Sequence, residues 1–168
     1  LQRNASMSYE DLLLAVEGRF RFEVERGKLK VSTTKDRFFE RSIAPENIRH
    51  VFDMCSEATL NAMKYSDREM AYVRITPFYE DDTFGLVFSS LRNGDAGKPQ
   101  CVEGHHYETM TERVFKSGNS GLEKMAHLAA SVARKPVKIR IFRRRRGFHV
   151  MVPLGCMTTE CEASNVKL

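Results

Sequence analysis

Strand patterns occur in this chain mostly as pairs around short turns, and amphipathic helical patterns separate the pairs. "MAYVRITPF" (70–78) and "TFGLVFSSL" (83–91) alternate apolar and polar residues on either side of the acidic turn "YEDD". "PVKIRIF" (136–142) and "GFHVMVPL" (147–154) do the same around "RRRRG". A period of two predicts half-buried strands, and a short polar turn between two such runs predicts antiparallel pairing. The pattern therefore favours a largely antiparallel sheet whose apolar face needs a cover.

Three segments have the periodicity of helices that could supply this cover. Residues 8–17 start at a serine suited to cap a helix and end before Gly18. Residues 47–66 repeat apolar side chains at i, i+3, i+4 and i+7, with Pro45 just before the start, where proline is tolerated. Residues 121–135 have the same period and end before Pro136. We therefore predict an α/β fold with helices on one face of the sheet.

The remaining segments are less regular. "FRFEVERGKLKV" (20–31) alternates around Arg26-Gly27, which predicts one more hairpin. Residues 92–121 are rich in Gly, Asn and Ser with little periodicity, and so long a loop inside a compact domain is usually functional or mobile. Residues 155–168 are polar, and we expect a frayed tail there.

Composition places the chain in a broad class. At 168 residues, with 42% hydrophobic residues, it is long enough for one packed domain. The net charge of +5 suits an anionic partner such as nucleotide phosphates or nucleic acid without requiring one. The four cysteines are scattered and form no CxxC pair, which favours a reducing, cytoplasmic setting. No apolar run reaches membrane-spanning length, so we expect no membrane contact from this segment.

"SEATLNAMKYSD" (56–67) places Glu57, Asn61 and Lys64 on one helical stripe, about opposite the apolar stripe. Alone, such a stripe fits a solvated helix face. Two glycine-containing turns accompany it, "RNGDAG" after the strand 83–91 and "SGNSGLEKM" at the start of the helix 121–135. Glycines at the start of a helix let the backbone approach an anion, and the free N–H groups there bind phosphate. The three motifs together indicate a phosphate-binding site.

This order of motifs resembles the GHKL superfamily of ATP-binding domains, which includes histidine kinases, type II topoisomerases and mismatch-repair ATPases. Segment 56–67 looks like the N box in its histidine kinase form, and the resemblance covers about residues 45–154. It implies a Bergerat-type two-layer α/β sandwich, in which helices cover one face of a mixed, mostly antiparallel sheet. Residues 1–44 would be an N-terminal helix and hairpin, part of or leading into this core, and 155–168 a C-terminal tail.

The resemblance also implies a role for each N-box residue. Asn61 would coordinate the Mg²⁺ that bridges the phosphates of ATP, Lys64 would reach phosphate oxygens, and Tyr65 would line the pocket. Glu57 stands where family members that hydrolyse ATP have their general base, and in kinases this position helps to organise the metal. Mg²⁺ prefers hard oxygen ligands and keeps several waters, so one amide oxygen from the protein can suffice.

The two glycine turns resemble the glycine boxes of the family. "SGNSGLEKM" resembles the second box, at the far edge of an ATP lid expected at residues 98–120. "RNGDAG" lies where the first box, usually D-x-G-x-G, belongs, and it departs from that pattern. The aspartate that recognises adenine would be Asp95, or Asn93 would stand in its place. The nucleotide-binding residues implied in the two boxes are Asn93, Gly94, Asp95, Gly97, Gly118, Ser120, Gly121 and Leu122.

Other candidate sites are weaker. Cys101, His105 and His106 have no zinc-site spacing. The arginines at 143–146 read as a solvated hairpin turn without an aromatic platform, so nucleic acid is not the expected partner. An acidic partner, such as a phosphoacceptor or regulator protein, fits this turn equally well. Residues 1–45 contain no histidine that could accept phosphate, so an acceptor would lie outside this chain.

The resemblance thus implies the catalytic domain of a histidine-kinase-like signalling protein in the cytoplasm. It would bind ATP and Mg²⁺ and transfer the γ-phosphoryl group to another domain or partner. Two alternatives stay open: a non-catalytic domain that serves as a scaffold or phosphotransfer docking module, and an ATPase that switches conformation with Glu57 as its base. The first residue is Leu1 rather than Met, which suggests a piece of a longer protein. A homodimer would use regions missing from it.

Overall fold

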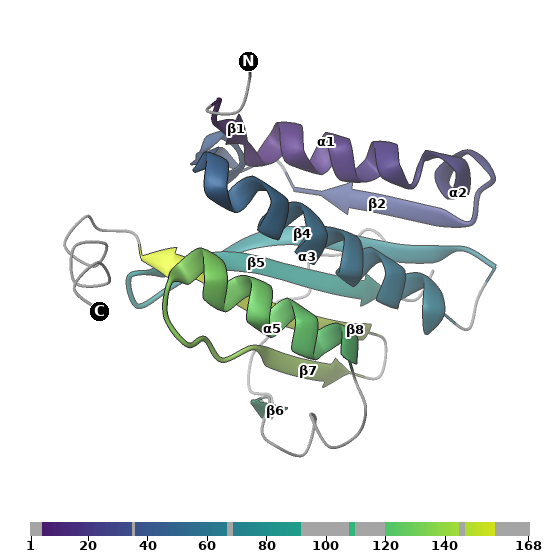
Figure 1. Ribbon diagram of the computed structural model, residues 1–168. Coiled ribbons are helices and arrows are strands. Elements are labelled where there is room, and N and C mark those ends of the chain that lie inside the picture. Colours follow the sequence, from purple (N-terminus) through teal and green to yellow (C-terminus); the bar gives the residue numbers. More distant parts are fainter. Residues whose placement is uncertain are drawn as a thin grey trace.

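A computed structural model describes residues 5–34, 36–66, 69–91, 108–109, 120–144 and 147–156 (Figure 1). The elements in chain order are β1 (Met7–Ser8), α1 (Tyr9–Arg19), α2 (Arg21–Glu25), β2 (Leu29–Thr33), the 3-10 helix η1 (Arg37–Glu40), β3 (Ser42–Ile43), α3 (Pro45–Lys64), β4 (Ala71–Glu80), β5 (Thr83–Leu91), β6 (Glu108–Thr109), α5 (Ser120–Ala133), β7 (Arg140–Arg144) and β8 (Gly147–Cys156). No described helix is both long and apolar enough to cross a bilayer.

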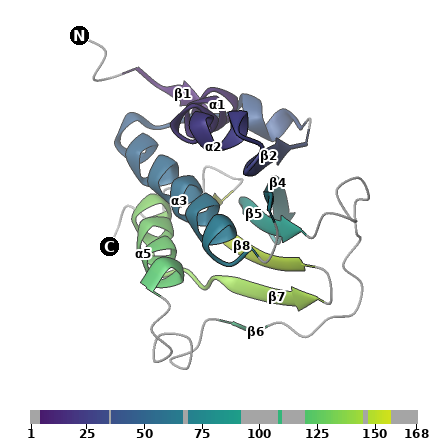
Figure 2. The same ribbon diagram turned by 90° about the vertical axis from the view of Figure 1, so that its right-hand side faces the viewer.

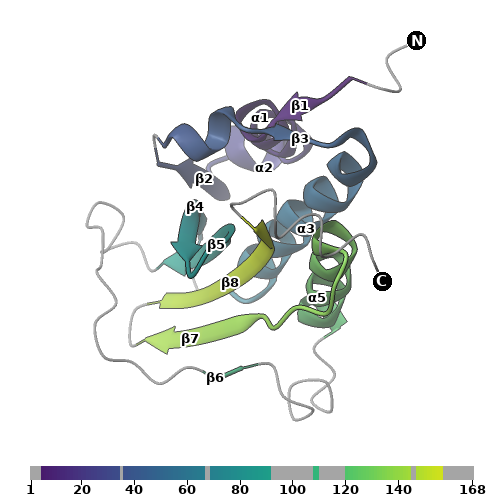
Figure 3. The same ribbon diagram turned by 90° about the vertical axis from the view of Figure 1, so that its left-hand side faces the viewer.

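The principal sheet has six strands in the order β2-β4-β5-β8-β7-β6. β2 and β4 pair in parallel, and all its other neighbours pair antiparallel. Helices α3 and α5 lie against one face of this sheet, and α1 packs on α3 beside the β2 edge (Figure 2). Figure 3 shows the two layers from the opposite side. The predicted two-layer α/β sandwich, with a mixed and mostly antiparallel sheet, is confirmed.

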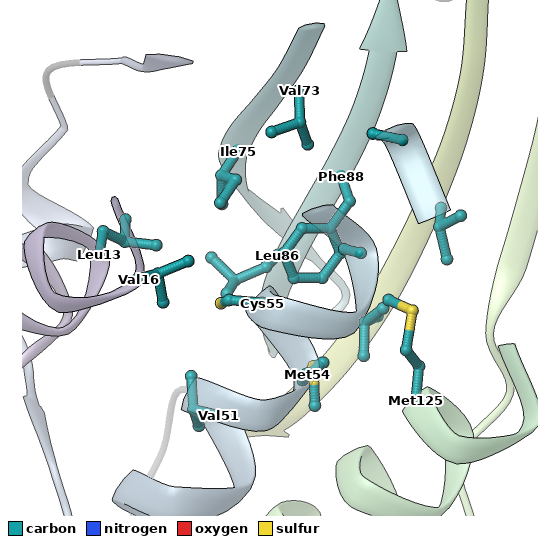
Figure 4. Close-up of a cluster of buried hydrophobic side chains, with 14 of the residues drawn as sticks. Leu13, Val16, Val51, Met54, Cys55, Val73, Ile75, Leu86, Phe88 and Met125 are labelled. Carbon is teal, nitrogen blue, oxygen red and sulfur yellow. The ribbon is translucent and has the colours of Figure 1, made fainter. Parts of the chain in front are cut away.

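The core lies between the helices and the sheet. Ile75 of β4, Phe88 of β5 and Val150 of β8 stand side by side across three strands, and all three are buried. Their period-two alternation brings every second side chain to this face. Helices α1, α3 and α5 close the cluster from the other side (Figure 4), with Leu13, Val16, Val51, Met54, Cys55 and Met125.

The β5–β8 pairing contains an irregularity between Phe84 and Gly85. A Cβ atom at Gly85 would lie 2.0 Å from the carbonyl oxygen of Val152 and 2.5 Å from the ring of Phe78. The backbone of β8 and an aromatic ring thus occupy the space that a side chain would need. Glycine is required here by close approach of the two strands.

The prediction of a hairpin over residues 20–31 is wrong. Residues Arg21–Glu25 form the short helix α2, and Gly27 turns the chain with a φ of 68°. Phe20 is buried whereas Phe22 is 61% exposed, so the two rings do not share a face as they would in a strand. The following strand, β2, pairs with β4 in parallel, and this connection passes through α3. N-terminal residues thereby join the principal sheet and its core.

The other predicted elements are present with shifted ends. Ser8 caps α1 as expected, since its Oγ accepts a hydrogen bond from the Asp11 N–H at 3.1 Å. The hairpins β4–β5 and β7–β8 are confirmed, and Asp81 and Asp82 form the first turn with φ of 45° and 64°. Strand β8 continues to the buried Cys156, two residues into the predicted tail, because these residues still pair with β5. Residues 157–168 lie outside the described residues.

Candidate functional site where α3 meets α5

Helix α3 presents the predicted polar stripe beside its buried face. Its buried residues are Val51, Met54, Cys55, Ser56, Ala58, Thr59 and Ala62. The Glu57 side chain is 18% exposed, and Asn61, one turn further on, is half-buried. Lys64 is the last helical residue, and the N–H of Tyr65 donates to the Asn61 carbonyl at 3.0 Å. The stripe is therefore only partly solvated over Glu57 and Asn61.

The start of α5 lies directly against these two side chains. Gly121 is buried, and a Cβ atom there would lie 2.8 Å from Glu57 Oε1, 2.8 Å from Asn61 Nδ2 and 2.9 Å from Asn61 Oδ1. Those distances are below normal contact for carbon, so a side chain at residue 121 would have to displace the ends of the Glu57 and Asn61 side chains. The side chains of Leu122 and Met125 anchor the same helix in the core.

Two ion pairs link α3 to α5 and to Arg134, the residue that follows α5, at separate places along α3. Lys124 Nζ lies 3.6 Å from Glu57 Oε2, and an Arg134 guanidinium nitrogen lies 3.3 Å from Glu46 Oε1. The partner numbers rise along one helix as they fall along the other, so the helices are antiparallel. Lys124 is a functional candidate that the sequence reasoning missed. Its signal was its position one turn after Gly121 in "SGLEKM", on the same helix face.

The structure brings together Glu57, Asn61 and Gly121 from the predicted set. Leu122 has its side chain buried in the core, so only its backbone could contribute to a site. Lys64 and Tyr65 lie at the C-terminal end of α3 and are exposed, with Lys64 Nζ 5.3 Å from the centre of the Tyr65 ring. Ser120 begins α5. Asn93, Gly94, Asp95, Gly97 and Gly118 lie outside the described residues, as does nearly all of the expected lid.

The donor atoms at this junction suit a hard cation and phosphate. Glu57 Oε1 and Asn61 Oδ1 both approach the position that a Cβ of residue 121 would occupy. Oxygen donors of this kind fit Mg²⁺, which completes its shell with water and substrate oxygens. Within the described residues no three His, Cys, Asp or Glu side chains cluster as a metal site, so a dedicated all-protein cage is not found there. The N-terminus of α5 adds backbone N–H groups and a positive dipole end.

Solved structures share this fold. The catalytic domain of histidine kinase ThkA in a nucleotide-free form is 13% identical, with a TM-score of 0.56 over 91% of this chain and 98% of that one. The histidine kinase domain of the Erythrobacter litoralis EL346 blue-light activated histidine kinase is 15% identical, with a TM-score of 0.56 over 92% of this chain and 69% of that one. Acinetobacter baumannii histidine kinase AdeS is 12% identical, with a TM-score of 0.53 over 89% of this chain and 66% of that one.

No family model matches the sequence of this chain, and no curated protein matches it either. At 12–15% identity the likeness to solved structures concerns the fold. The chain has the fold of histidine kinase catalytic domains, as its motifs led us to expect.

Proposed function

We propose that this chain is the ATP-binding catalytic domain of a histidine-kinase-like signalling protein of the cytoplasm. It would transfer the γ-phosphoryl group of ATP to a residue on another domain or partner. The observation that carries the proposal is the meeting of Glu57 and Asn61 with Gly121, so close that an added side chain would displace them. The likeness in fold to histidine kinase catalytic domains supports the proposal that phosphates bind at this junction.

Each residue at the junction would have a separate task. Asn61 Oδ1 would bind Mg²⁺, and Glu57 would orient the metal's water ligands or bind it directly. When bound, Mg²⁺ would neutralise charge on the phosphate oxygens. The α5 backbone from Ser120 onward would donate N–H groups to phosphate. Lys64, at the exposed end of α3, would add positive charge, and Tyr65 would contact the nucleotide.

Lys124 would be a further phosphate-binding residue at this junction. It neutralises Glu57 across the helix junction while 57% of its own side chain stays exposed. A flexible ammonium group in that position can turn from the carboxylate to a phosphate oxygen when nucleotide arrives. Lys124 would thus hold the site together before ATP binds and would supply a phosphate contact afterwards.

The first test is thermal melting of the chain with and without ATP and Mg²⁺. A ligand that binds only the folded state stabilises it, by about 2.7 kcal/mol at a hundred times its dissociation constant. We expect a higher melting temperature for the parent and no rise for Asn61→Ala. Asn47→Ala, on the first turn of the same helix, is the matched control and should keep the full rise. No rise in the parent at millimolar nucleotide would contradict ATP binding.

A second test separates phosphotransfer from ATP hydrolysis. With γ-labelled ATP, the label should move to an added acceptor domain or regulator protein, docked through the basic residues 143–146. The position of the Glu57 carboxylate at the junction also suits the alternative function, an ATPase that switches conformation with Glu57 as its base. If the domain is a switching ATPase, Glu57→Gln should abolish phosphate release while the thermal shift with ATP persists. Label transfer without phosphate release would exclude that alternative.

A further inference from the structure

A second concave surface lies beside α1, at the β2 edge of the sheet. It is a hollow of about 520 Å³ between α1, β2 and the segment that leads into η1. β2 is the edge strand, whereas α5 packs over β8 further across the sheet. We call this hollow the α1 groove. The residues that line it are Glu10, Leu13, Leu14, Glu17, Val31, Thr33, Thr34, Asp36, Arg37, Phe39 and Glu40.

The floor of the α1 groove is apolar. Leu13 and Phe39 are buried and belong to the main core, and Val31 is partly buried against it. Leu14, by contrast, is 61% exposed, although it lines the same hollow. A large aliphatic side chain left this open beside an apolar floor gains free energy when another apolar surface covers it, about 25 cal/mol per Å² buried.

The rim of the α1 groove is acidic, although the chain as a whole carries +5. Among the described residues that line it, Glu10, Glu17, Asp36 and Glu40 carry carboxylates and Arg37 carries a positive charge. Asp36 accepts a hydrogen bond from the Tyr79 hydroxyl at 3.2 Å. Across the described ranges, no ion pair joins Glu10, Glu17 or Glu40 to a cation.

Apolar and acidic side chains alternate in blocks along one stripe of α1. Glu10, Leu13, Leu14 and Glu17 follow the i, i+3, i+4, i+7 spacing, so they share one stripe of the helix. The stripe therefore has leucines in its middle and a carboxylate at each end. A complementary segment would carry apolar side chains in its middle and cations at its flanks.

We propose that the α1 groove binds a cationic amphipathic segment of a partner polypeptide. Its apolar side chains would cover Leu14 and the floor, and its Lys or Arg side chains would pair with the rim. The volume is within the range of about 300–1,000 Å³ that protein pockets use for drug-sized ligands, so it can take several side chains. This surface is separate from the α3/α5 junction, and the inference goes beyond the proposed function.

The test uses three synthetic peptides of about four helical turns each. The first has leucines on one face and lysines elsewhere, the second has glutamates in place of those lysines, and the third keeps the lysines but has serines for leucines. Binding to the whole chain is followed by fluorescence anisotropy at about 0.15 M salt. General attraction to a chain of charge +5 would favour the glutamate peptide. Tighter binding of the leucine–lysine peptide than of both others is the expected result.

Variants locate the binding. Leu14→Ser should weaken the leucine–lysine peptide about tenfold, whereas Phe22→Ser, which removes an equally exposed ring outside the groove, should not change it. The double variant Glu10→Lys with Glu17→Lys should also lose about tenfold. Glu69→Lys, an exposed acid away from the groove, is its control. All the changed residues are exposed, and unchanged melting temperatures would verify the fold.

Three results would overturn the proposal. The first is equal binding of the lysine and glutamate peptides, and the second is binding that Leu14→Ser leaves unchanged. The third is a dimer of the parent, measured by analytical ultracentrifugation, that Leu14→Ser converts to monomer, since the occupant would then be a second copy of this chain. The thermal shift with ATP and Mg²⁺ on the same variants keeps this test independent of the proposed function, because α1 does not contribute to that site.

Discussion

The α3/α5 junction and the α1 groove both bring carboxylates to an apolar base, but they differ in the space they leave. At the junction a single added carbon on Gly121 would meet three polar atoms within 2.9 Å. At the groove a hollow of about 520 Å³ lies open, and Leu14 stands 61% exposed beside it. The charge is handled differently too, because Glu57 has Lys124 as its partner.

This difference indicates what each surface can select. A tight junction with oxygen donors and helix-terminal N–H groups excludes anything larger than an ion or a phosphate edge from its deepest point. A wide groove imposes no such size limit and selects instead by the match of charge and apolar area. The junction would therefore select a ligand by its size, and the groove would select a ligand through its exposed apolar and charged side chains.

The largest effect concerns the core that the two regions share. Cys55 is fully buried on α3, and burial raises the pKa of its thiol from 9.0 to about 12. The unfolded chain loses this proton at lower pH than the folded one, so stability is complete below pH 9.0 and is lost as the pH rises toward 12. The whole difference corresponds to about 4 kcal/mol. Burial raises the pKa of the Tyr9 phenol as well, which adds loss of the same sign.

Urea denaturation over this alkaline range measures the effect. Cys55→Ala should lower stability at neutral pH through its cavity but should flatten the alkaline loss, leaving the share of Tyr9. Because Leu13 of the groove and Leu122 of the junction belong to one cluster, probes placed at each should report a single transition. Two separate transitions would show that the regions are independent units and would remove the basis for comparing them as parts of one core.

The next prediction compares the effect of an added methyl group at the junction with that of an added methyl group on α1. Gly121→Ala should weaken ATP·Mg²⁺ binding at least tenfold, because its methyl group would displace Glu57 and Asn61. Calorimetric titration measures this affinity. Gly18→Ala is the matched control, since a Cβ there meets nothing within 4 Å and glycine costs about 1 kcal/mol in a helix relative to alanine. It should raise the melting temperature and leave ATP affinity alone. Similar ATP affinity in both variants would argue against a tight junction as the binding site.

The smallest effect distinguishes the two ion pairs between α3 and α5. Each pair has at least one largely exposed partner, so Lys124→Gln and Glu46→Gln should each change stability by less than about 1 kcal/mol. Only Lys124→Gln should weaken ATP binding, by about two- to fivefold, since only that pair lies beside Gly121. Equal ATP affinity of the two variants, measured by the same titration, would mean that Lys124 merely ties the helices together.

The parts of the fold that local sequence patterns specify could be predicted. Period-two alternation around short turns located β4–β5 and β7–β8, and a regular apolar stripe located α3 and α5. Helical spacing placed Glu57 and Asn61 on one stripe, but their assignment to a functional site also needed the two glycine turns and the family resemblance. That Gly121 meets them depends on how α5 packs across α3, which no local pattern contains. The family resemblance supplied that expectation.

The N-terminal region shows where local patterns are insufficient. "FRFEVER" satisfies a period of two, but Phe20 and Val24 are also one helical turn apart, as are Arg21 and Glu25, which form an ion pair at 2.7 Å. Over so few residues both periods fit, and tertiary packing selects the helix. The α1 groove could not be predicted either, because its lining comes from α1, β2 and residues 33–40, which meet only in the folded chain.

The position of β8 has a consequence for how the chain acquires its structure during synthesis. This strand is made after all the others, yet it lies between β5 and β7 in the interior of the sheet. The β4–β5 hairpin can form early, but it presents an unpaired edge until residues 147–156 have left the ribosome. Because a strand edge is a template for pairing with other chains, the nascent protein passes through a state that is open to aggregation. We expect shielding of that edge by chaperones to govern the yield of folded protein.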